Sequence, residues 1–228
     1  MTAPAPPPLA VVIPALNAAS TLPATLAALA AELPAGSEVV VVDGGSRDTT
    51  VAAARQAGAR VIVATRGRGT QIAAGVAATR AAWVLLLHAD TRLAPDWAGA
   101  AAAHIAAHPA RAGYFRFVLD SGDSRARRLE RAVAWRCRVL ALPYGDQGLL
   151  IRRDVLASAG GVPAVPLMED VALVRALGRA RLVPLDATAL TSAAKWEQQG
   201  WTRRSARNLV LLALYFCGVP PRLLARLY

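Results

Sequence analysis

The chain has 228 residues, of which 55% are hydrophobic and 18% charged, a composition that supports one sizeable core and excludes an intrinsically disordered protein. The net charge of +11 favours anionic partners such as nucleotide phosphates or an acidic membrane surface. The basic residues are interleaved with apolar ones at 125–138 and 203–226, which favours basic amphipathic helices or a solvated basic face over a nucleic-acid-binding arm.

Apolar β-branched runs alternate with helical patterns through the first half of the chain. Strands that are apolar throughout and separated by helices indicate an α/β fold with a mostly parallel sheet, flanked by helices on both faces. The predicted strands lie at 9–15, 38–45, 60–65 and 81–90, and the predicted helices at 20–33, 46–58 and 69–80.

The pattern changes after about residue 110. The alternating run at 113–119 predicts an antiparallel strand at an edge of the sheet. No internal repeat or linker is visible, so we predict a single domain over 9–228 that follows a flexible, Pro-rich segment at 1–8. The later elements predicted are a basic amphipathic helix at 124–142, a short strand and a helix within 145–161, a helix at 168–178, and an apolar helix at 205–218 that Gly218 and Pro220 end.

Cysteine usage and the ends of the chain predict a cytoplasmic protein. Cys137 and Cys217 lie far apart without metal-ligand spacing, which is typical of a reduced pair. The first ten residues lack the pattern of a signal peptide, and the apolar run at 209–219 is too short to span a bilayer. The apolar 209–216 face with its nearby arginines leaves three alternatives open: packing on the chain's own core, a homo-oligomer, or peripheral contact with the inner membrane face.

Polar residues follow the predicted parallel strands, and the carboxyl ends of such strands bind ligands. Asp43, followed by two glycines, can accept hydrogen bonds from a base or ribose, or it can cap a turn together with Asp48. Arg66 and Arg68, each next to a glycine, suit a diphosphate, although a solvated loop is equally compatible with the pattern. The G-K-[ST] of a P-loop is absent.

The stretch "LLLHADTRL" ends an apolar strand with His88 and Asp90, whose side chains share one face of an extended chain. A carboxylate there can hold Mg²⁺ or Mn²⁺ together with waters and diphosphate oxygens, whereas imidazole is a poor ligand for Mg²⁺. We therefore expect Asp90 to be the metal ligand. His88 is interpreted as its neighbour, either a hydrogen-bond donor to phosphate or a buried histidine.

Two further pairs of polar residues lie in the second half. Glu169 and Asp170 begin a predicted helix, where the helix dipole alone favours acids, but one of them could also act as a general base. Asp146 and Gln147 lie between glycines before a short strand, and they form either a substrate contact or an ordinary turn.

These motifs occur in one order: "IPALN", "DGGSRDTT", a Gly/Arg loop, "HAD", "GDQG" and "ED". That order resembles glycosyltransferase family 2, inverting enzymes with the nucleotide-diphosphosugar transferase fold called GT-A. Within the family it looks most like the short bacterial group labelled as arsenosugar-biosynthesis-type glycosyltransferases. The resemblance covers about residues 9–228 and implies a nucleotide-binding half at 9–110 and an acceptor-side half at 111–228 with a helical C-terminal part.

The resemblance implies a hexosyltransferase-like reaction that uses a nucleotide-diphosphate sugar, with UDP as the first candidate, and Mg²⁺ or Mn²⁺. Asp170 would be the catalytic base, beside Glu169, and Asp90 the metal ligand. The acceptor hydroxyl would attack the anomeric carbon opposite the diphosphate, which inverts the configuration without a protein nucleophile. The implied donor-binding residues are Pro14, Asn17, Asp43, Gly44, Arg66, Arg68, His88, Ala89 and Asp90.

Two departures from the family pattern bear on the substrate. His88 replaces the usual first acid, and the Q-x-x-R-W motif of processive members is replaced by "AAKWEQQGW". Without that motif, the resemblance implies transfer of one sugar to a small or lipid-linked acceptor. The acceptor-side residues implied are Asp146, Gln147, Lys195 and Trp196.

Two other functions remain as alternatives. A sugar nucleotidyltransferase needs a Gly-rich, basic loop directly after the first strand, and "IPALNAAS" does not supply one. A non-catalytic nucleotide-binding or membrane-associated scaffold is compatible with His88 in place of an acid.

Overall fold

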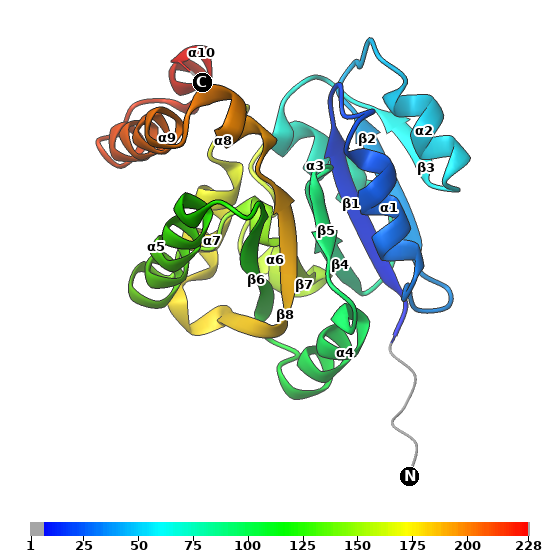
Figure 1. Ribbon diagram of the computed structural model, residues 1–228. Helices are drawn as coiled ribbons and strands as arrows, with labels where there is room; N and C mark the ends of the chain where they lie inside the picture. The colour runs from blue at the N-terminus through cyan, green and yellow to red at the C-terminus, as the bar shows by residue number, and fades with distance from the viewer. Residues whose placement is uncertain (1–6, 228) are drawn as a thin grey trace.

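The computed structural model describes residues 7–227. Most of the segment predicted to be flexible, residues 1–6 of 1–8, lies outside this range. The described chain forms an eight-stranded sheet in the order β3-β2-β1-β4-β7-β6-β8-β5, flanked by helices (Figure 1).

The first half has the predicted alternation of strands and helices. Strands β3, β2, β1 and β4 are parallel neighbours, as their apolar sequences indicate. Their elements are β1 (Leu9–Ala15), α1 (Leu22–Ala30), β2 (Glu38–Asp43), α2 (Thr50–Gln56), β3 (Arg60–Val63), α3 (Arg68–Ala77) and β4 (Trp83–Leu86).

The second half makes the sheet mixed. Strand β7 is antiparallel to both β4 and β6, while β6 is parallel to β8, and the short β5 closes the edge against β8. The elements are β5 (Thr91–Leu93), α4 (Trp97–Ala107), β6 (Ala112–Asp120), α5 (Ser124–Leu140), β7 (Leu149–Arg152), α6 (Arg153–Ser158), α7 (Glu169–Leu177), β8 (Leu182–Ser192), α8 (Ala194–Gln199), α9 (Trp201–Phe216) and α10 (Pro221–Leu227), with 3₁₀ turns η1 (Gly145–Gln147) and η2 (Arg179–Arg181).

The prediction of an edge position for the strand at 113–119 was wrong. Strand β6 lies inside the sheet, between β7 and β8. Buried and more exposed side chains alternate along β6 because one face of the strand packs on the core and the other faces solvent. Strands inside a sheet can show this alternation as well as strands at an edge. The covering strand β8 was not predicted, because Pro184 and Asp186 interrupt its apolar pattern.

Successive side chains of the central strands enter two different cores. Val11 and Ile13 of β1 pack with α1 and α4, whereas Val12 packs with α3, α6 and α7 on the opposite face. Helix α3 can approach the sheet closely because a Cβ at Gly75 would lie only 2.4 Å from Val12 Cγ1. This close approach fixes the start of α3 beside the carboxyl ends of β1 and β2.

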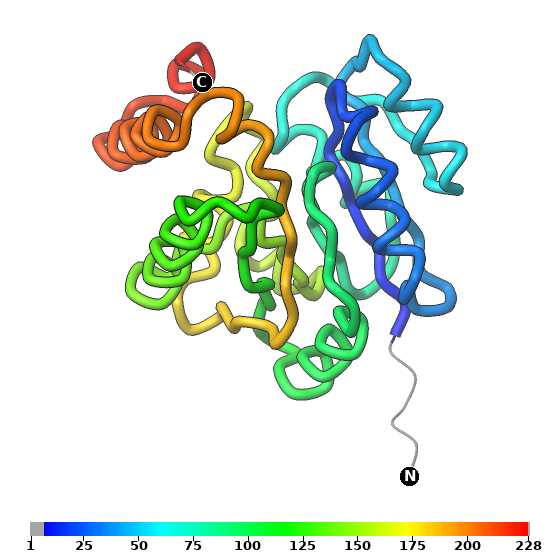
Figure 2. Tube along the Cα trace, in the orientation of Figure 1, coloured from blue at the N-terminus to red at the C-terminus, as the bar shows by residue number. Residues whose placement is uncertain are grey.

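The C-terminal helices gather on one side of the molecule. Figures 1 and 2 show α9 and α10 on the same side as α5, away from α2 and β3. Helix α9 packs through Leu212 and Tyr215 near Val171 and Val174 of α7, and through Leu211 near Leu224 of α10. Within residues 7–227, no helix has the length and apolar character that crossing a membrane requires.

Candidate active site

The loops that follow β1 and β2, at the carboxyl ends of these strands, are joined by hydrogen bonds. The Asn17 amide N donates to Ser46 Oγ at 2.9 Å, and Asn17 Oδ1 accepts from Arg47 N at 2.8 Å. The Asp43 carboxylate, which is buried, accepts from the Gly45 and Ser46 amides at 2.9 and 3.0 Å through Oδ2. Asp43 therefore caps its own turn, which holds its carboxylate at the rim of the sheet. Its contact with a base or ribose stays a prediction.

Gln71, which sequence reasoning missed, joins this rim to α3. Its Nε2 donates to Ala15 O at 2.9 Å and to Val42 O at 2.7 Å, which satisfies two buried carbonyls at the strand ends. A Cβ at Gly44 would lie 3.0 Å from the Gln71 carboxamide, so the glycine leaves room for this bridge. The signal in the sequence was a glutamine on the buried face of α3, one residue before Ile72.

The Gly/Arg loop connects the rim to the start of α7. Arg68 Nη1 lies 3.3 Å from Glu169 Oε1, whereas Arg66 is exposed. Gly69 N donates to Val165 O at 3.2 Å, and a Cβ at this glycine would lie 2.1 Å from Pro163 O. The two arginines therefore face different surroundings, and Arg68 is the one held inside the site.

The "HAD" segment follows β4, which ends at Leu86, before the predicted end of the strand. Asp90 Oδ2 accepts from Lys195 Nζ at 2.9 Å, a contact across 105 positions of sequence. Burial by itself raises the pKa of Asp90, but the neighbouring basic groups, with the Lys195 ammonium first among them, together lower that pKa below the ordinary value. Ala89 is buried under the segment, and its carbonyl accepts from Thr25 Oγ1 at 3.1 Å.

His88 is a neutral imidazole at neutral pH. Burial lowers the pKa of His88 to about 4, and the Arg68 guanidinium contributes in the same direction. Its Nε2 is buried and makes no hydrogen bond within the described part of the chain. A Cβ at Gly145 would lie 2.4 Å from this nitrogen, so the first glycine of "GDQG" is required for the His88 ring to fit.

Two acids begin α7, directly after Met168, whose φ of 63° lies in the left-handed region. Asp170 Oδ2 accepts from Gly145 N at 2.9 Å, and its Oδ1 accepts from Val171 N at 2.8 Å. Glu169 is 1% exposed and faces Arg68. Burial raises the pKa of Glu169 to about 7, although the Arg68 guanidinium opposes the rise.

The 3₁₀ turn η1 contains Asp146, a partly buried acid, and Gln147, which fixes the turn to the sheet. Burial raises the pKa of Asp146 to about 6, although Arg136 opposes this, and the charges of Asp170 and Asp90 add to the rise, so these three carboxylates interact. The Asp146 Oδ1 is buried and makes no hydrogen bond among residues 7–227. Gln147 instead holds the turn, because its Nε2 donates to Phe115 O at 3.1 Å.

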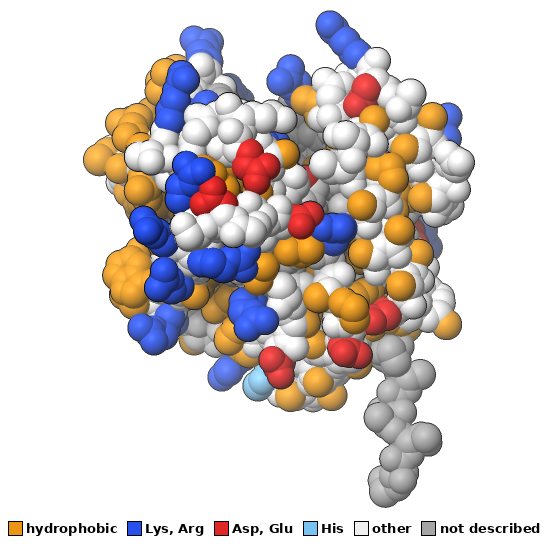
Figure 3. Space-filling view, viewed as in Figure 1, with side chains coloured by type: hydrophobic (Ala, Val, Ile, Leu, Met, Phe, Trp, Pro, Cys, Tyr) orange, Lys and Arg blue, Asp and Glu red, His pale blue; other side chains and the backbone are white. Residues whose placement is uncertain are grey.

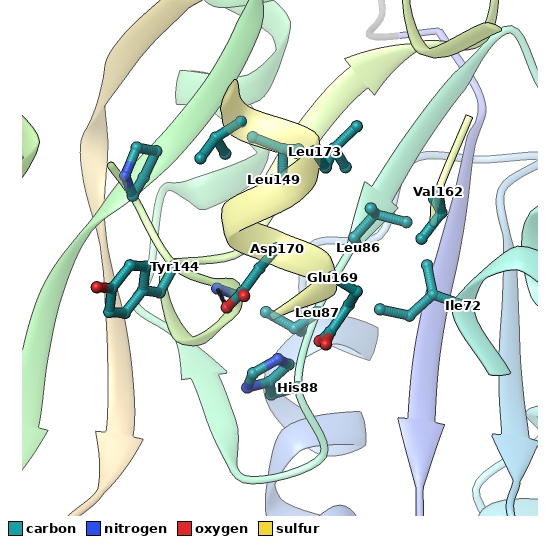
Figure 4. Close-up of a pocket in the computed structure, with 13 residues that line it drawn as sticks. Ile72, Leu86, Leu87, His88, Tyr144, Leu149, Val162, Glu169, Asp170 and Leu173 are labelled. Atoms are coloured by element: carbon teal, nitrogen blue, oxygen red, sulfur yellow. Dashed lines mark hydrogen bonds between the residues drawn. The ribbon is translucent and has the colours of Figure 1, made fainter. Parts of the chain in front are cut away.

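A pocket lies between the end of β4, the turn η1 and the start of α7. Its polar lining consists of His88, Tyr144, Glu169 and Asp170, and the remaining walls are apolar apart from the glycine of η1. Figure 4 shows Glu169 and Asp170 at the first turn of α7, close to the His88 ring. Trp196 is not part of this lining and is buried with Phe117 and Trp201 in a separate apolar cluster.

We expect Glu169 to make stability depend on pH. Its carboxyl has an ordinary pKa of 4.5 in the unfolded chain and about 7 in the fold, so the folded state binds the extra proton between these values. The free energy of unfolding should fall as pH rises from 4.5 to 7, by roughly 3 kcal/mol relative to Glu169→Gln, which cannot ionise. Urea denaturation across this range measures the difference. An exposed control, Glu197→Gln, should follow the wild type, and parallel curves for wild type and Glu169→Gln would refute the expectation.

The donor set at Asp90 fits a hydrated divalent ion. Among residues 7–227, no group of three or more histidine, cysteine, aspartate or glutamate side chains could enclose a metal. Mg²⁺ commonly binds through one or two carboxylates and takes its other ligands from water and substrate phosphates. In this structure the Asp90 carboxylate is paired with the Lys195 ammonium, 2.9 Å from Oδ2, and a metal ion at this carboxylate would take the place of that ammonium.

The parallel β3-β2-β1-β4 half and the mixed second half, with carboxylates along the carboxyl edge, define the GT-A fold of nucleotide-diphosphosugar transferases. The sequence model of glycosyl transferase family 2 matches residues 10–157, and the chain belongs to this family.

Curated relatives match a shorter stretch. Uncharacterised glycosyltransferases of Mycobacterium bovis and Mycobacterium tuberculosis are each 43% identical to the chain over 81 residues. The match spans 35% of this chain and 35% of each relative.

Solved structures confirm the fold. Glucosyl-3-phosphoglycerate synthase from Mycobacterium tuberculosis, in complex with Mn²⁺, UDP-glucose and phosphoglyceric acid, has a TM-score of 0.64 at 20% identity, over 94% of this chain and 81% of that one. The same enzyme with Mg²⁺ and UDP has a TM-score of 0.60 at 20% identity, over 82% of this chain and 70% of that one.

Proposed function

We propose that the protein is an inverting glycosyltransferase that moves one sugar from a nucleotide diphosphate to a hydroxyl of a small or lipid-linked acceptor. The observation that carries this proposal is the meeting of the "HAD" segment, the turn η1 and the start of α7 in one pocket, where Asp170 accepts from Gly145 N and His88 packs against the same glycine. The carboxylates of Asp90, Asp146 and Asp170 lie close enough there for their charges to interact. A structural neighbour binds UDP-glucose, a metal ion and a small acceptor, which supports the same class of substrates here.

The donor would lie across the two bonded loops and the "HAD" segment. Its base, with uracil as the first candidate, would contact Asp43 and the Pro14–Asn17 segment, and Gly44 would let it approach the backbone. Arg68, which already faces the start of α7, would contact the diphosphate, with Arg66 nearer solvent.

Asp90 would hold Mg²⁺ or Mn²⁺ beside the diphosphate, with Lys195 displaced from the carboxylate or turned toward a phosphate oxygen. When bound, the metal neutralises charge that develops on the leaving diphosphate. Glu169 positions Arg68 through their ion pair. Fixed positive groups aimed at the leaving group are worth more in a buried site than in water.

Asp170 would act as the base. Its Oδ2, oriented by the Gly145 amide, would take the proton of the acceptor hydroxyl as the acceptor oxygen bonds to the anomeric carbon. The bond from that carbon to the diphosphate oxygen breaks in the same step, and its electron pair leaves with the nucleotide diphosphate. Attack and departure on opposite faces invert the anomeric centre. Asp146 and Lys195 would line the acceptor side, whereas Gln147 and Trp196 support it from within the fold.

A donor screen tests the proposal. UDP-, GDP- and dTDP-sugars are incubated with the protein and Mn²⁺, and released nucleotide diphosphate is measured with and without candidate acceptors. We expect one nucleotide class to be turned over and the release to require the divalent ion. If no nucleotide sugar is bound or turned over, the protein is not a transferase of this kind.

A further inference from the structure

The large apolar side chains exposed to solvent are concentrated on three helices. Nine such side chains occur among the described residues, and eight of them lie on α5, α9 and α10, whereas the ninth, Val63, lies on β3. The eight are Trp135, Val139, Leu140, Leu209, Val210, Phe216, Leu223 and Leu227, which we call the apolar helix surface.

Helix α9 presents a continuous apolar face to solvent. Its exposed residues Ala206, Leu209, Val210, Ala213 and Phe216 recur at spacings of three and four, which places them on one side of the helix. The opposite side packs on the molecule, through contacts of α9 with α7 and α10. The exposed face is therefore not needed for the chain's own core.

The same helices contain many arginines and almost no acids, so the net positive charge of the protein is concentrated on them. Residues 124–140 and 201–228 contain eleven arginines and a single acid, Glu130, so these segments account for ten of the eleven net positive charges. On α5, Arg131 and Arg138 are exposed on either side of the half-exposed ring of Trp135. Figure 3 shows arginines and apolar side chains mixed along the side that α5 and α9 occupy in Figure 1.

We propose that α5, α9 and α10 dock the protein on the surface of an anionic lipid bilayer. Apolar side chains set among arginines match the boundary of a bilayer, where acyl chains meet negatively charged headgroups. An aromatic ring such as Trp135 is favoured at that depth. The helices lie on the bilayer and do not cross it.

Charge selects lipid over a second copy of the chain. A symmetric dimer through this surface would bring two sets of arginines together, with only Glu130 in these segments to offset them, and like charges at an interface are unfavourable. An anionic leaflet attracts each of these side chains instead. Lys195 lies on α8, immediately before α9, so docking would bring the acceptor side of the site close to the membrane surface.

Vesicle binding tests this inference independently of the transferase proposal. The protein could turn over a nucleotide sugar without binding vesicles, and it could bind vesicles without turning over a nucleotide sugar. The full chain is sedimented with vesicles of phosphatidylcholine alone or with about one third phosphatidylglycerol. We expect binding to the anionic vesicles only. Replacing two exposed apolar residues, Leu209→Gln/Val210→Gln, should weaken it about 10-fold. Replacing two exposed charges, Arg222→Gln/Arg226→Gln, should weaken it roughly 30-fold.

Matched controls lie outside the apolar helix surface. Val63→Gln removes an apolar side chain that is 76% exposed on β3, and Arg55→Gln/Arg80→Gln removes two exposed charges; both should bind like the wild type. Absence of binding, or losses equal in variants and controls, overturns the proposal. A dimer in light scattering that Leu209→Gln/Val210→Gln dissociates, without vesicle binding, also overturns it, because the surface then serves a second copy.

Discussion

Replacing Asp170 with asparagine should lower the turnover number about 1,000-fold while leaving donor affinity within about twofold, because general-base catalysis contributes about 10²- to 10⁴-fold. Asparagine keeps the shape of the side chain but only one of its two acceptor oxygens, so it can accept from Gly145 N or from Val171 N but not from both. A control that loses a comparable helix-start bond therefore separates this effect from loss of proton transfer. Steady-state release of nucleotide diphosphate at saturating donor gives the turnover number, and calorimetry gives the affinity.

Asp154→Asn is the matched control. Asp154 begins α6 as Asp170 begins α7, and in each the Oδ1 accepts from the next amide at 2.8 Å. The two substitutions therefore remove the same helix-start charge, and only one removes the proposed base. Equal turnover numbers for the two variants would show that Asp170 is not the catalytic base.

The second large effect concerns Asp90. We expect Asp90→Asn to lower turnover at least about 100-fold and to weaken binding of the nucleotide diphosphate with Mn²⁺, because a bound metal supplies several kcal/mol of charge stabilisation. Titrating Mn²⁺ at fixed donor concentration should show saturation shifted upward in the variant. Binding without metal should be similar in both proteins.

Asp120→Asn controls for loss of an ion pair. Asp120 pairs with Arg92 as Asp90 pairs with Lys195, but the Asp120 side chain is 58% exposed at the end of β6, whereas that of Asp90 is 19% exposed. It should retain normal turnover and normal dependence on Mn²⁺. The same metal dependence in Asp90→Asn and wild type would place the metal elsewhere.

The parallel half of the fold was predictable because its signals are local. Each central strand is buried on both faces, so its sequence is apolar throughout, and β1 and β2 are each followed directly by a helical period. Polar residues at the strand ends then predicted which edge of the sheet carries the site. The carboxylates at 90 and 170 lie at that edge, near His88.

The second half was less predictable because its order depends on pairing between distant segments. Nothing local in "LVPLDATALTS" shows that it runs beside β6, and without it β6 looks like an edge. The same reason hides the contact of Lys195 with Asp90, which β5 and β8 create by pairing Thr91 with Thr191. Trp196 follows Lys195 in sequence, but its ring turns into the apolar cluster of α5, β6 and α9.

Burial created properties that a pattern cannot supply. Glu169 and Asp146 have raised pKa values because the fold removes them from water. Gln71 became the bridge between two strand ends because Gly44 leaves space for it. Such roles follow from three-dimensional packing. For Gln71, however, a polar residue on the buried face of a predicted helix was a signal that the sequence offered.

The most direct measurement is the position of Mn²⁺, by anomalous scattering, in crystals soaked with the nucleotide diphosphate that the donor screen selects. We expect one manganese within about 2.2 Å of an Asp90 oxygen. The nucleobase should lie beside Asp43, and the terminal phosphate of the diphosphate should face Asp170. A nucleotide bound away from these three carboxylates, or a manganese without Asp90 as a ligand, would contradict the proposed active site.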